Sequence, residues 1–283
     1  MSRPMPQPVV RPAFEAFTAC PERTVVALDF DGTLADITDR PDEARIRPGG
    51  IDVLRHLAAQ GAGLVIVTGR PAADAVARAG FAGVPGLERL TVLGLYGAQR
   101  WDAATGRLTV TPPAPGIAAA RAELPGILAG APGRATVEDK QASLAVHTRG
   151  APDPAHLLRA LRGPLTRLAD RQGLLLEPGR NVWELRSPGV DKGVALGRLL
   201  DERATAAVLY AGDDRGDLAA FRELTRRRAG GLPATLVYSA PAAADEQVAE
   251  LRESADEVVG GPEGVLALLA RLADEMAASC QAE

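Results

Sequence analysis

The sequence is poor in cysteine and has no long apolar segment. Its 283 residues include only two cysteines, Cys20 and Cys280, too few for a disulfide framework or a cysteine-rich metal site. No apolar run approaches the ~18 residues of a membrane span. Residues 1–17 contain no apolar stretch typical of a signal peptide. We therefore expect a protein of the reducing cytoplasm with no membrane partner.

An excess of positive charge is also missing. The net charge is −4, whereas general nucleic-acid binding needs a basic field, so nucleic acid is not an expected partner. With 46% hydrophobic residues and 24% charged residues, the chain has enough apolar surface to fold around a core. At ~150 residues per domain, the length predicts about two domains.

Lysine is nearly absent from the basic residues. Of 32 basic residues only Lys140 and Lys192 are lysines, and the other 30 are arginines. The two lysines could mark sites that need a compact ammonium group and would not accept a planar guanidinium. The alternative is that two surface lysines survived by chance, and composition alone does not decide between these interpretations.

Short apolar strands alternate with helical segments in the two outer parts of the chain. Such alternation predicts an α/β fold with a parallel sheet in three layers. The expected strands cover 24–30, 63–70, 90–95, 206–212 and 234–240. The expected helices cover 51–60, 71–80 with Pro71 as the first helical residue, 192–203, 218–228 and 263–278.

The middle of the chain has a different pattern. Strand-like segments at 107–112, 135–149 and 173–188 accompany helical segments at 114–128 and 153–169. We expect residues 105–187 to form an inserted, smaller α+β lid domain, with residues 1–104 and 188–283 forming the core.

The first expected strand ends in two aspartates. Asp29 and Asp31 are two residues apart, so both side chains would extend past the carboxyl end of the strand, where open α/β sheets bind ligands. Adjacent carboxylates repel each other and need a cation or a proton. Alone, the D-x-D-G pattern is equally typical of a turn.

Three more polar features follow at matching places in the fold. Thr68-Gly69-Arg70 ends the second strand with a hydroxyl and backbone amides that can hold a phosphate. Lys192 begins a helix, and the fourth strand ends in an acidic cluster with Asp213, Asp214 and Asp217. Oxygen ligands of this kind suit Mg²⁺.

Together these motifs resemble those of the haloacid dehalogenase-like phosphohydrolases, a family with a Rossmann-like core. The resemblance implies that Asp29 attacks phosphorus to form an aspartyl-phosphate, while Asp31 acts as general acid and base. Thr68 and Lys192 are implied catalytic residues that hold phosphoryl oxygens. The implied Mg²⁺ ligands are Asp29, the backbone carbonyl of Asp31, and Asp213, with support from Asp214 and Asp217.

The middle of the chain narrows the resemblance to trehalose-6-phosphate phosphatases. V-E-D-K at 137–140 with L-A-V-H-T-R at 144–149, and E-P-G-R-N-V-W-E-L-R at 177–186, are similar to elements of that family, as is the extended first motif at 30–48. The substrate-binding residues implied by this resemblance are Gly32, Thr68, Gly69, Arg70, Glu138, Lys140, His147, Arg149 and Glu184.

Departures and alternatives accompany this interpretation. Tyr96-Gly97-Ala98-Gln99 stands where the family usually has H-G-A-E, and Gly216 replaces a threonine. Glu184 could instead form an ion pair with Arg186 or Arg180. The expected function is Mg²⁺-dependent hydrolysis of trehalose 6-phosphate to trehalose and phosphate. The alternatives are a phosphatase for another sugar phosphate (sucrose, mannosylglycerate or glucosylglycerol phosphate), a phosphomutase, and a catalytically silent regulatory domain. A synthase partner is left open.

Overall fold

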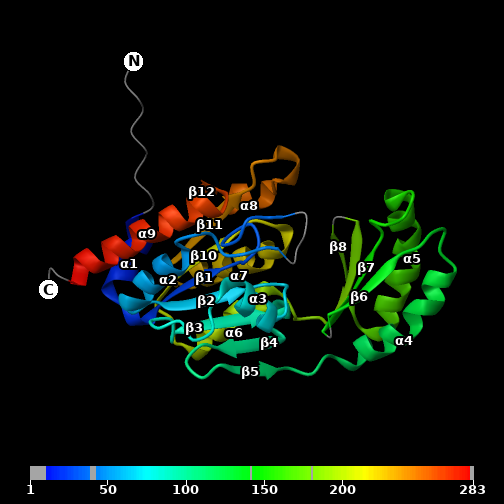
Figure 1. The fold of residues 1–283 in the computed structure, drawn as a ribbon, viewed down its shortest axis with the longest axis horizontal. Helices are drawn as coiled ribbons and strands as arrows, with labels where there is room; N and C mark the ends of the chain where they lie inside the picture. Colours follow the sequence, from blue (N-terminus) through cyan, green and yellow to red (C-terminus); the bar gives the residue numbers. More distant parts are fainter. Residues whose placement is uncertain (1–10, 39–42, 141, 180, 281–283) are drawn as a thin grey trace, which may run out of the picture. The chain divides into compact units, whose positions relative to one another are not determined.

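The chain divides into two compact units. The computed structural model describes residues 11–38, 43–140, 142–179 and 181–280 (Figure 1). The first unit comprises Met1–Thr109 and Asp191–Glu283, and the second comprises Val110–Val190. These divisions lie a few residues beyond the predicted ones at 104/105 and 187/188.

The first unit is built on an eight-stranded sheet in the order β12-β11-β10-β1-β2-β3-β4-β5. The pairs from β12 to β3 are parallel, and β4 pairs with β3 antiparallel. The predicted α/β class with a mainly parallel sheet is therefore confirmed. The strands are β1 Thr24–Leu28, β2 Gly63–Val67, β3 Leu90–Gly94, β4 Gln99–Asp102, β5 Arg107–Val110, β10 Ala207–Gly212, β11 Ala234–Ala240 and β12 Glu257–Gly260.

Helices cover both faces of this sheet, so the central strands are buried on each side. In β1, Val26 and Leu28 pack into one apolar cluster, whereas Val25 and Ala27 pack into another. This two-sided burial explains why the strands are continuous apolar runs. The first cluster includes residues of α2 (Gly50–Ala59), α3 (Ala72–Ala79) and α9 (Gly261–Cys280), with α1 (Arg11–Ala19) against α9; the second includes residues of α6 (Lys192–Glu202), α7 (Leu218–Ala229) and α8 (Ala249–Ser254).

The second unit is a four-stranded antiparallel sheet with two helices. The strand order is β6-β7-β9-β8, and one apolar cluster joins the sheet to both helices. Because directly paired residues share a face, the other face carries a row formed by Glu138, Ala145, Glu184 and Glu177. The elements are α4 Pro115–Ala129, β6 Thr136–Asp139, β7 Ser143–His147, α5 Pro154–Gln172, β8 Leu175–Gly179 and β9 Val182–Arg186.

Some elements differ from the sequence expectation. The segment at 107–112, expected in the insertion, contributes β5 to the sheet of the first unit, because β4 turns back through residues 103–106 to form a hairpin. Pro71, expected as the first helical residue, is instead the N-cap of α3 with extended backbone. The pattern did not predict α1, α8 or β12; β12 is only four residues long and has no fully buried residue.

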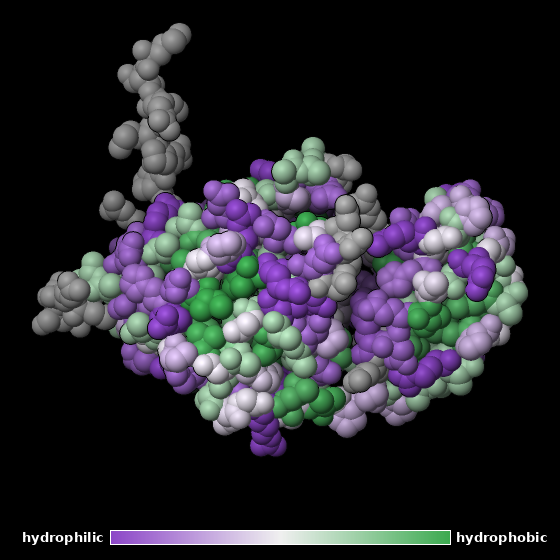
Figure 2. Space-filling model, in the orientation of Figure 1, coloured by the Kyte–Doolittle hydropathy of each residue, from purple (hydrophilic) through white to green (hydrophobic). Residues whose placement is uncertain are grey.

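The surface of the first and second units carries both polar and apolar side chains. Within the described ranges, none of the helices combines the length and apolar character that crossing a membrane requires. Figure 2 shows hydrophilic and hydrophobic residues interspersed over the visible face. The exposed large apolar side chains are Ile37, Leu108, Val110, Val137, Leu175 and Val258.

Candidate active site

Asp29 and Asp31 follow β1 at the carboxyl edge of the parallel sheet. The backbone N–H of Asp29 donates to Ala211 of β10 (2.9 Å), and Phe30 between the two aspartates is fully buried in the core. Asp29 is only 4% exposed. Its Oδ1 accepts the N–H of Phe30 (2.7 Å), while its Oδ2 lies 2.7 Å from the Nζ of Lys192. One carboxylate oxygen of Asp29 is therefore tied to a buried ammonium group.

Lys192 lies at the centre of the acidic cluster. It is the first residue of α6, after Asp191, whose carboxylate accepts the N–H of Val194 (2.8 Å) as N-cap. Its side chain is 3% exposed, and Nζ lies 2.7 Å from Asp217 and 3.9 Å from Asp214 in addition to Asp29. Burial opposes the charged form of Lys192, but the carboxylates of Asp217 and Asp29 outweigh it and raise its pKa well above the ordinary value.

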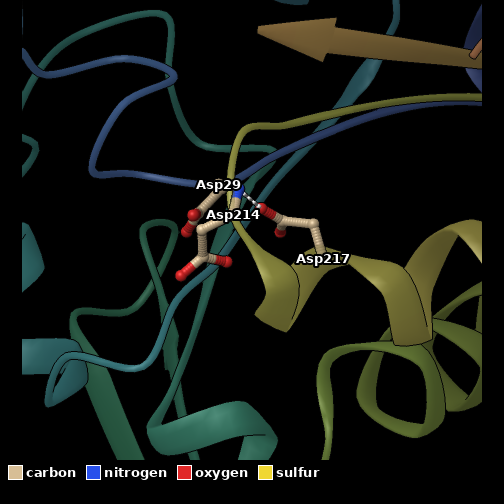
Figure 3. A group of neighbouring side chains, drawn as sticks. All are labelled: Asp29, Asp214 and Asp217. Atoms are coloured by element: carbon tan, nitrogen blue, oxygen red, sulfur yellow. Dashed lines mark hydrogen bonds between the residues drawn. The ribbon is translucent and has the colours of Figure 1, made fainter. Parts of the chain in front are cut away.

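Asp217 lies in the turn after β10, and each of its two carboxylate oxygens accepts two hydrogen bonds. Its Oδ1 accepts from Lys192 (2.7 Å) and from the Tyr210 hydroxyl (2.5 Å), and its Oδ2 accepts the N–H groups of Asp213 (2.9 Å) and Asp214 (3.0 Å). The bond to Asp214 is drawn in Figure 3. Asp217 is completely buried, so its role in this turn is to position the lysine and the two preceding aspartates.

Asp29, Asp214 and Asp217 each offer an oxygen within 4.8 Å of the others, the spacing of a cation site (Figure 3). The ammonium of Lys192 lies within 3.9 Å of all three carboxylates. Lys192 therefore already supplies the counter-charge for these three carboxylates. A metal ion bound here would need oxygen ligands from other residues as well.

Asp213 supplies such an oxygen. It is 5% exposed, and its Oδ1 has no hydrogen-bond partner among the residues that the structure describes. Burial raises the pKa of Asp213 to about 10, and Asp29 adds to this effect. A Cβ on Gly32 (φ +71°) would lie 2.1 Å from Asp213 Oδ2, so this carboxylate lies directly against the loop after β1. An unsatisfied buried carboxylate beside Asp29 fits a hard cation such as Mg²⁺.

The turn after β2 lies beside a strained segment that the sequence did not single out as functional. Thr68 is 1% exposed, and its hydroxyl accepts the N–H of Arg70 (3.1 Å). A Cβ on Gly69 would lie 2.8 Å from the hydroxyl of Tyr96. Leu95 and Tyr96 both have left-handed backbone (φ 49° and 56°), which non-glycine residues seldom adopt. Strained backbone of this kind is often found at functional sites. Tyr96, which stands where the family usually has histidine, lies next to the expected phosphate-binding turn.

Arg70 is paired with Asp31. Its Nε and one terminal nitrogen each lie 2.6 Å from a different oxygen of Asp31, forming a two-pronged ion pair. The other terminal nitrogen lies 3.2 Å from Asp74, and the guanidinium lies over the ring of Phe30 at 5.8 Å. The hydrogen bond with Asp31 raises the pKa of Arg70 further above its ordinary value. Asp74 was not identified from the sequence. Its spacing of four residues from Arg70, at the start of α3, is the sequence feature that could have indicated this ion pair.

The expected sugar-binding residues of the second unit lie mostly on the sheet face opposite its helices. Glu138 is 2.9 Å from His147, and Lys140 is 3.6 Å from Glu184. Ser143, which the motif did not identify, donates to Glu184 (2.5 Å). Arg149 is exposed after β7, outside this row.

Glu184 forms an ion pair with Lys140, a partner that was not considered from the sequence. Arg186 lies 3.2 Å from Glu177, while the acid that Lys140 contacts is Glu184. Arg180 and the 39–42 portion of the first motif lie outside the described residues. Trp101 packs in the core of the first unit, and Trp183 donates from its indole to Leu158, so packing is the role of both.

Known proteins resemble this chain in sequence and in fold. A family model described as trehalose-phosphatase matches residues 27–255. A trehalose-phosphate phosphatase of Mycobacterium tuberculosis is 35% identical over 208 residues, covering 69% of this chain and 50% of the relative. An uncharacterized glycosyl hydrolase of the same species is 36% identical over 212 residues, covering 70% of this chain and 15% of the relative. The chain thus spans half or less of the length of these relatives.

Solved structures share the fold at lower sequence identity. The C-terminal domain of a Candida albicans trehalose-6-phosphate phosphatase has a TM-score of 0.69 at 20% identity, covering 96% of this chain and 99% of that one. A haloacid dehalogenase-like hydrolase from Bacteroides thetaiotaomicron has a TM-score of 0.63 at 15% identity, covering 88% and 99%. With the family model matching most of its length, the chain belongs to the trehalose-phosphatase family.

Proposed function

We propose that this chain hydrolyses trehalose 6-phosphate to trehalose and inorganic phosphate in a Mg²⁺-dependent reaction. The observation that carries the proposal is the contact of Asp29 with the buried Lys192, 2.7 Å long, at the carboxyl edge of the sheet in a member of this family. A carboxylate buried there can act as a nucleophile beside a fixed positive charge.

The chemistry follows from the two aspartates after β1. A carboxylate oxygen of Asp29 forms a bond to phosphorus as the bond from phosphorus to the sugar oxygen breaks, giving an aspartyl-phosphate. Asp31 donates a proton to the departing sugar oxygen and then takes one from the water that releases phosphate. Lys192 offsets the negative charge on the phosphoryl group.

The residues that would hold Mg²⁺ are Asp29, Asp213 and the backbone carbonyl of Asp31, with Asp214 and Asp217 around them. The cation would supply positive charge that lets the buried carboxylates and a phosphate dianion share one site. Asp213, with its unpartnered buried oxygen, supports this assignment. Asp217 supports the site differently, because its oxygens hold Lys192, Tyr210 and the backbone of the turn.

Arg70 orients Asp31 in this proposal. The two-pronged contact fixes both oxygens of Asp31, the group that takes a proton from water in the second half of the proposed reaction. Donation to the sugar oxygen requires Asp31 to leave Arg70, and Asp74 remains as a second partner for the guanidinium. Thr68 and Gly69 would contact phosphoryl oxygens from the adjacent turn.

The polar sheet face of the second unit is the proposed sugar-recognition surface. Glu138, Lys140, His147 and Glu184 present charged and hydrogen-bonding groups there, and the second unit would act as the lid over the sugar. Other sugar phosphates and a silent regulatory role stay as alternatives, and a panel of sugar phosphates distinguishes them by phosphate release.

The first test is the change Asp29→Asn. An amide cannot attack phosphorus, so phosphate release from trehalose 6-phosphate in the presence of Mg²⁺ should fall to the background rate. Thermal unfolding of the variant should still show a cooperative transition. If wild-type protein releases no phosphate from any member of the panel, the silent alternative holds; turnover by Asp29→Asn would show that another group is the nucleophile.

The change Asp31→Asn should depend on the leaving group. A sugar alkoxide needs a proton, so turnover of trehalose 6-phosphate should fall by roughly 10² to 10⁴. Turnover of an aryl phosphate, whose leaving group departs without a proton, should fall much less. Equal losses on both substrates, measured by phosphate release, would mean that Asp31 acts through structure or metal binding.

The metal assignment is tested without activity, by thermal unfolding with Mg²⁺ and with EDTA. A ligand at ~100 times its Kd stabilises by about 2.7 kcal/mol, so Mg²⁺ should raise the wild-type Tm by several degrees. Asp213→Asn should abolish this shift and should raise the Tm in EDTA, because it removes a buried acid whose raised pKa disfavours the folded state above its ordinary pKa. Asp52→Asn, at an exposed acid of α2, is the control that keeps the Mg²⁺ shift. A wild-type shift retained in Asp213→Asn would contradict the assignment.

Sugar recognition is tested by replacing Glu138 or Lys140 with alanine. Groups that become buried when they pair with sugar hydroxyls discriminate strongly between substrates, so kcat/KM for trehalose 6-phosphate should fall sharply while that for a small aryl phosphate stays nearly unchanged. Asp139→Ala is the matched control, since Asp139 is on the same strand and bonds to Arg121 of α4. Wild-type kinetics in Glu138→Ala and Lys140→Ala would reduce both residues to a surface role, worth under ~1 kcal/mol.

A further inference from the structure

A charged cavity lies at the amino ends of the parallel strands, opposite the carboxyl ends that carry the catalytic aspartates. Its volume is about 240 Å³, and its lining includes Arg23, Arg89, Arg203, Thr205 and Gly63. These residues precede or begin β1, β2, β3 and β10, which run parallel. Since β1 spans five residues at about 3.3 Å each, the cavity is separated from Asp29 by roughly 17 Å.

The three arginines are bound by neutral oxygens. Arg23 donates twice to the carbonyl of Ala204 (3.0 and 2.9 Å), and Arg89 donates to the carbonyl of Glu22 (2.7 Å). Arg203 donates to the hydroxyl of Thr91 (2.7 Å). In the described part of the chain, no ion pair within 4.0 Å involves any of these three guanidinium groups. Three positive charges therefore face a small cavity without a bound counter-charge.

Two acids that act electrostatically on Arg203 are already paired with another arginine. Asp102 and Glu202, which act on Arg203, both lie against Arg100, at 3.1 and 2.6 Å. Burial, and then the like charge of Arg100, lower the pKa of Arg203, with Arg89 adding to the effect. The acid in the lining, Glu22, is exposed and binds Arg89 through its backbone carbonyl. The cavity is thus short of negative charge.

The backbone is shaped to hold these groups. Ala204 has left-handed backbone (φ 46°), which is costly for a residue other than glycine, and its carbonyl is the one that Arg23 binds. A Cβ on Gly63 would lie 2.7 Å from a terminal nitrogen of Arg203. The hydroxyl oxygen of Thr205 is buried and has no hydrogen-bond partner among the described residues. It is a polar group that a ligand in the cavity could satisfy.

We propose that this cavity binds a phosphoryl group, either as free phosphate or on a small metabolite, at a site separate from the catalytic aspartates. Guanidinium groups match the paired oxygens of a tetrahedral dianion, and three of them with a hydroxyl donor suit its charge and its oxygens. An adjoining hollow of about 640 Å³, which shares Arg23 and Thr205, leaves room for the rest of a metabolite.

The test is calorimetric titration of the full chain in EDTA with inorganic phosphate and, separately, with glycerol phosphate. Each charge-assisted hydrogen bond contributes enough that Arg203→Met and Arg89→Met should each weaken phosphate binding by about 10-fold or more. Arg198→Met is the matched control, because Arg198 is exposed on α6, and it should bind as wild type does. Thermal unfolding verifies that each variant is folded. If Arg203→Met does not fold, Arg89→Met, at an exposed residue, tests the proposal instead.

The two probes distinguish the sources of the phosphoryl group. Tighter binding of inorganic phosphate, lost in the Arg203 and Arg89 variants, assigns the site to free phosphate. Comparable or tighter binding of glycerol phosphate, lost in the same variants, assigns it to a metabolite. The proposal is overturned if wild type binds neither probe, or if both arginine variants bind them with wild-type affinity.

Discussion

The ammonium of Lys192 is the interaction on which the rest of the catalytic edge depends. Asp29 and Asp217 are both buried, and each lies 2.7 Å from this group. Without it, two buried carboxylates would lie close together with no counter-charge, which is strongly destabilising. The same contact fixes Asp217, which orders the turn carrying Asp213 and Asp214. A guanidinium is too large and planar for three acids converging on one point, so the retention of lysine in an arginine-rich chain has a physical reason here.

The sequence could predict that the acidic residues, Thr68 and Lys192 meet at the carboxyl ends of the parallel strands, because this follows from local patterns and one geometric rule. Apolar runs marked the strands, each run ended in polar residues, and parallel strands bring their carboxyl ends to one edge. The partners of each side chain were not predictable in the same way. Arg70 was expected to bind phosphate, yet its guanidinium contacts Asp31, 39 residues away in sequence. Tyr210 reads as a core strand residue, and only the fold brings its hydroxyl to Asp217.

In the second unit, too, the sequence pattern predicted the elements but not the contacts between side chains. Its helices and strands were recognisable, but β6 is exposed along its whole length and carries no alternation that would assign a face. Pairing in register decides the face: Glu138 lies opposite Ala145, and Ala145 lies opposite Glu184. The expected ion pairs of Glu184 with arginine were drawn from nearness in sequence, whereas the contact with Lys140 is made across the sheet through neighbouring strands. Motif resemblance grouped the residues, and sheet geometry determines which of them can act together.

Two groups of arginines have different kinds of partner, a difference that composition could not show. In α7, Arg227 and Arg228 bind Asp201, Glu223 and Asp256, so these arginines hold neighbouring elements together. Arg23, Arg89 and Arg203 instead bind carbonyl and hydroxyl oxygens at the amino edge of the sheet. A guanidinium bound to a carboxylate has its charge neutralised, whereas one bound to a carbonyl keeps its full charge. The amino edge is therefore the complement of the catalytic edge: one holds excess carboxylates around a single lysine, and the other holds excess guanidinium groups around a small cavity.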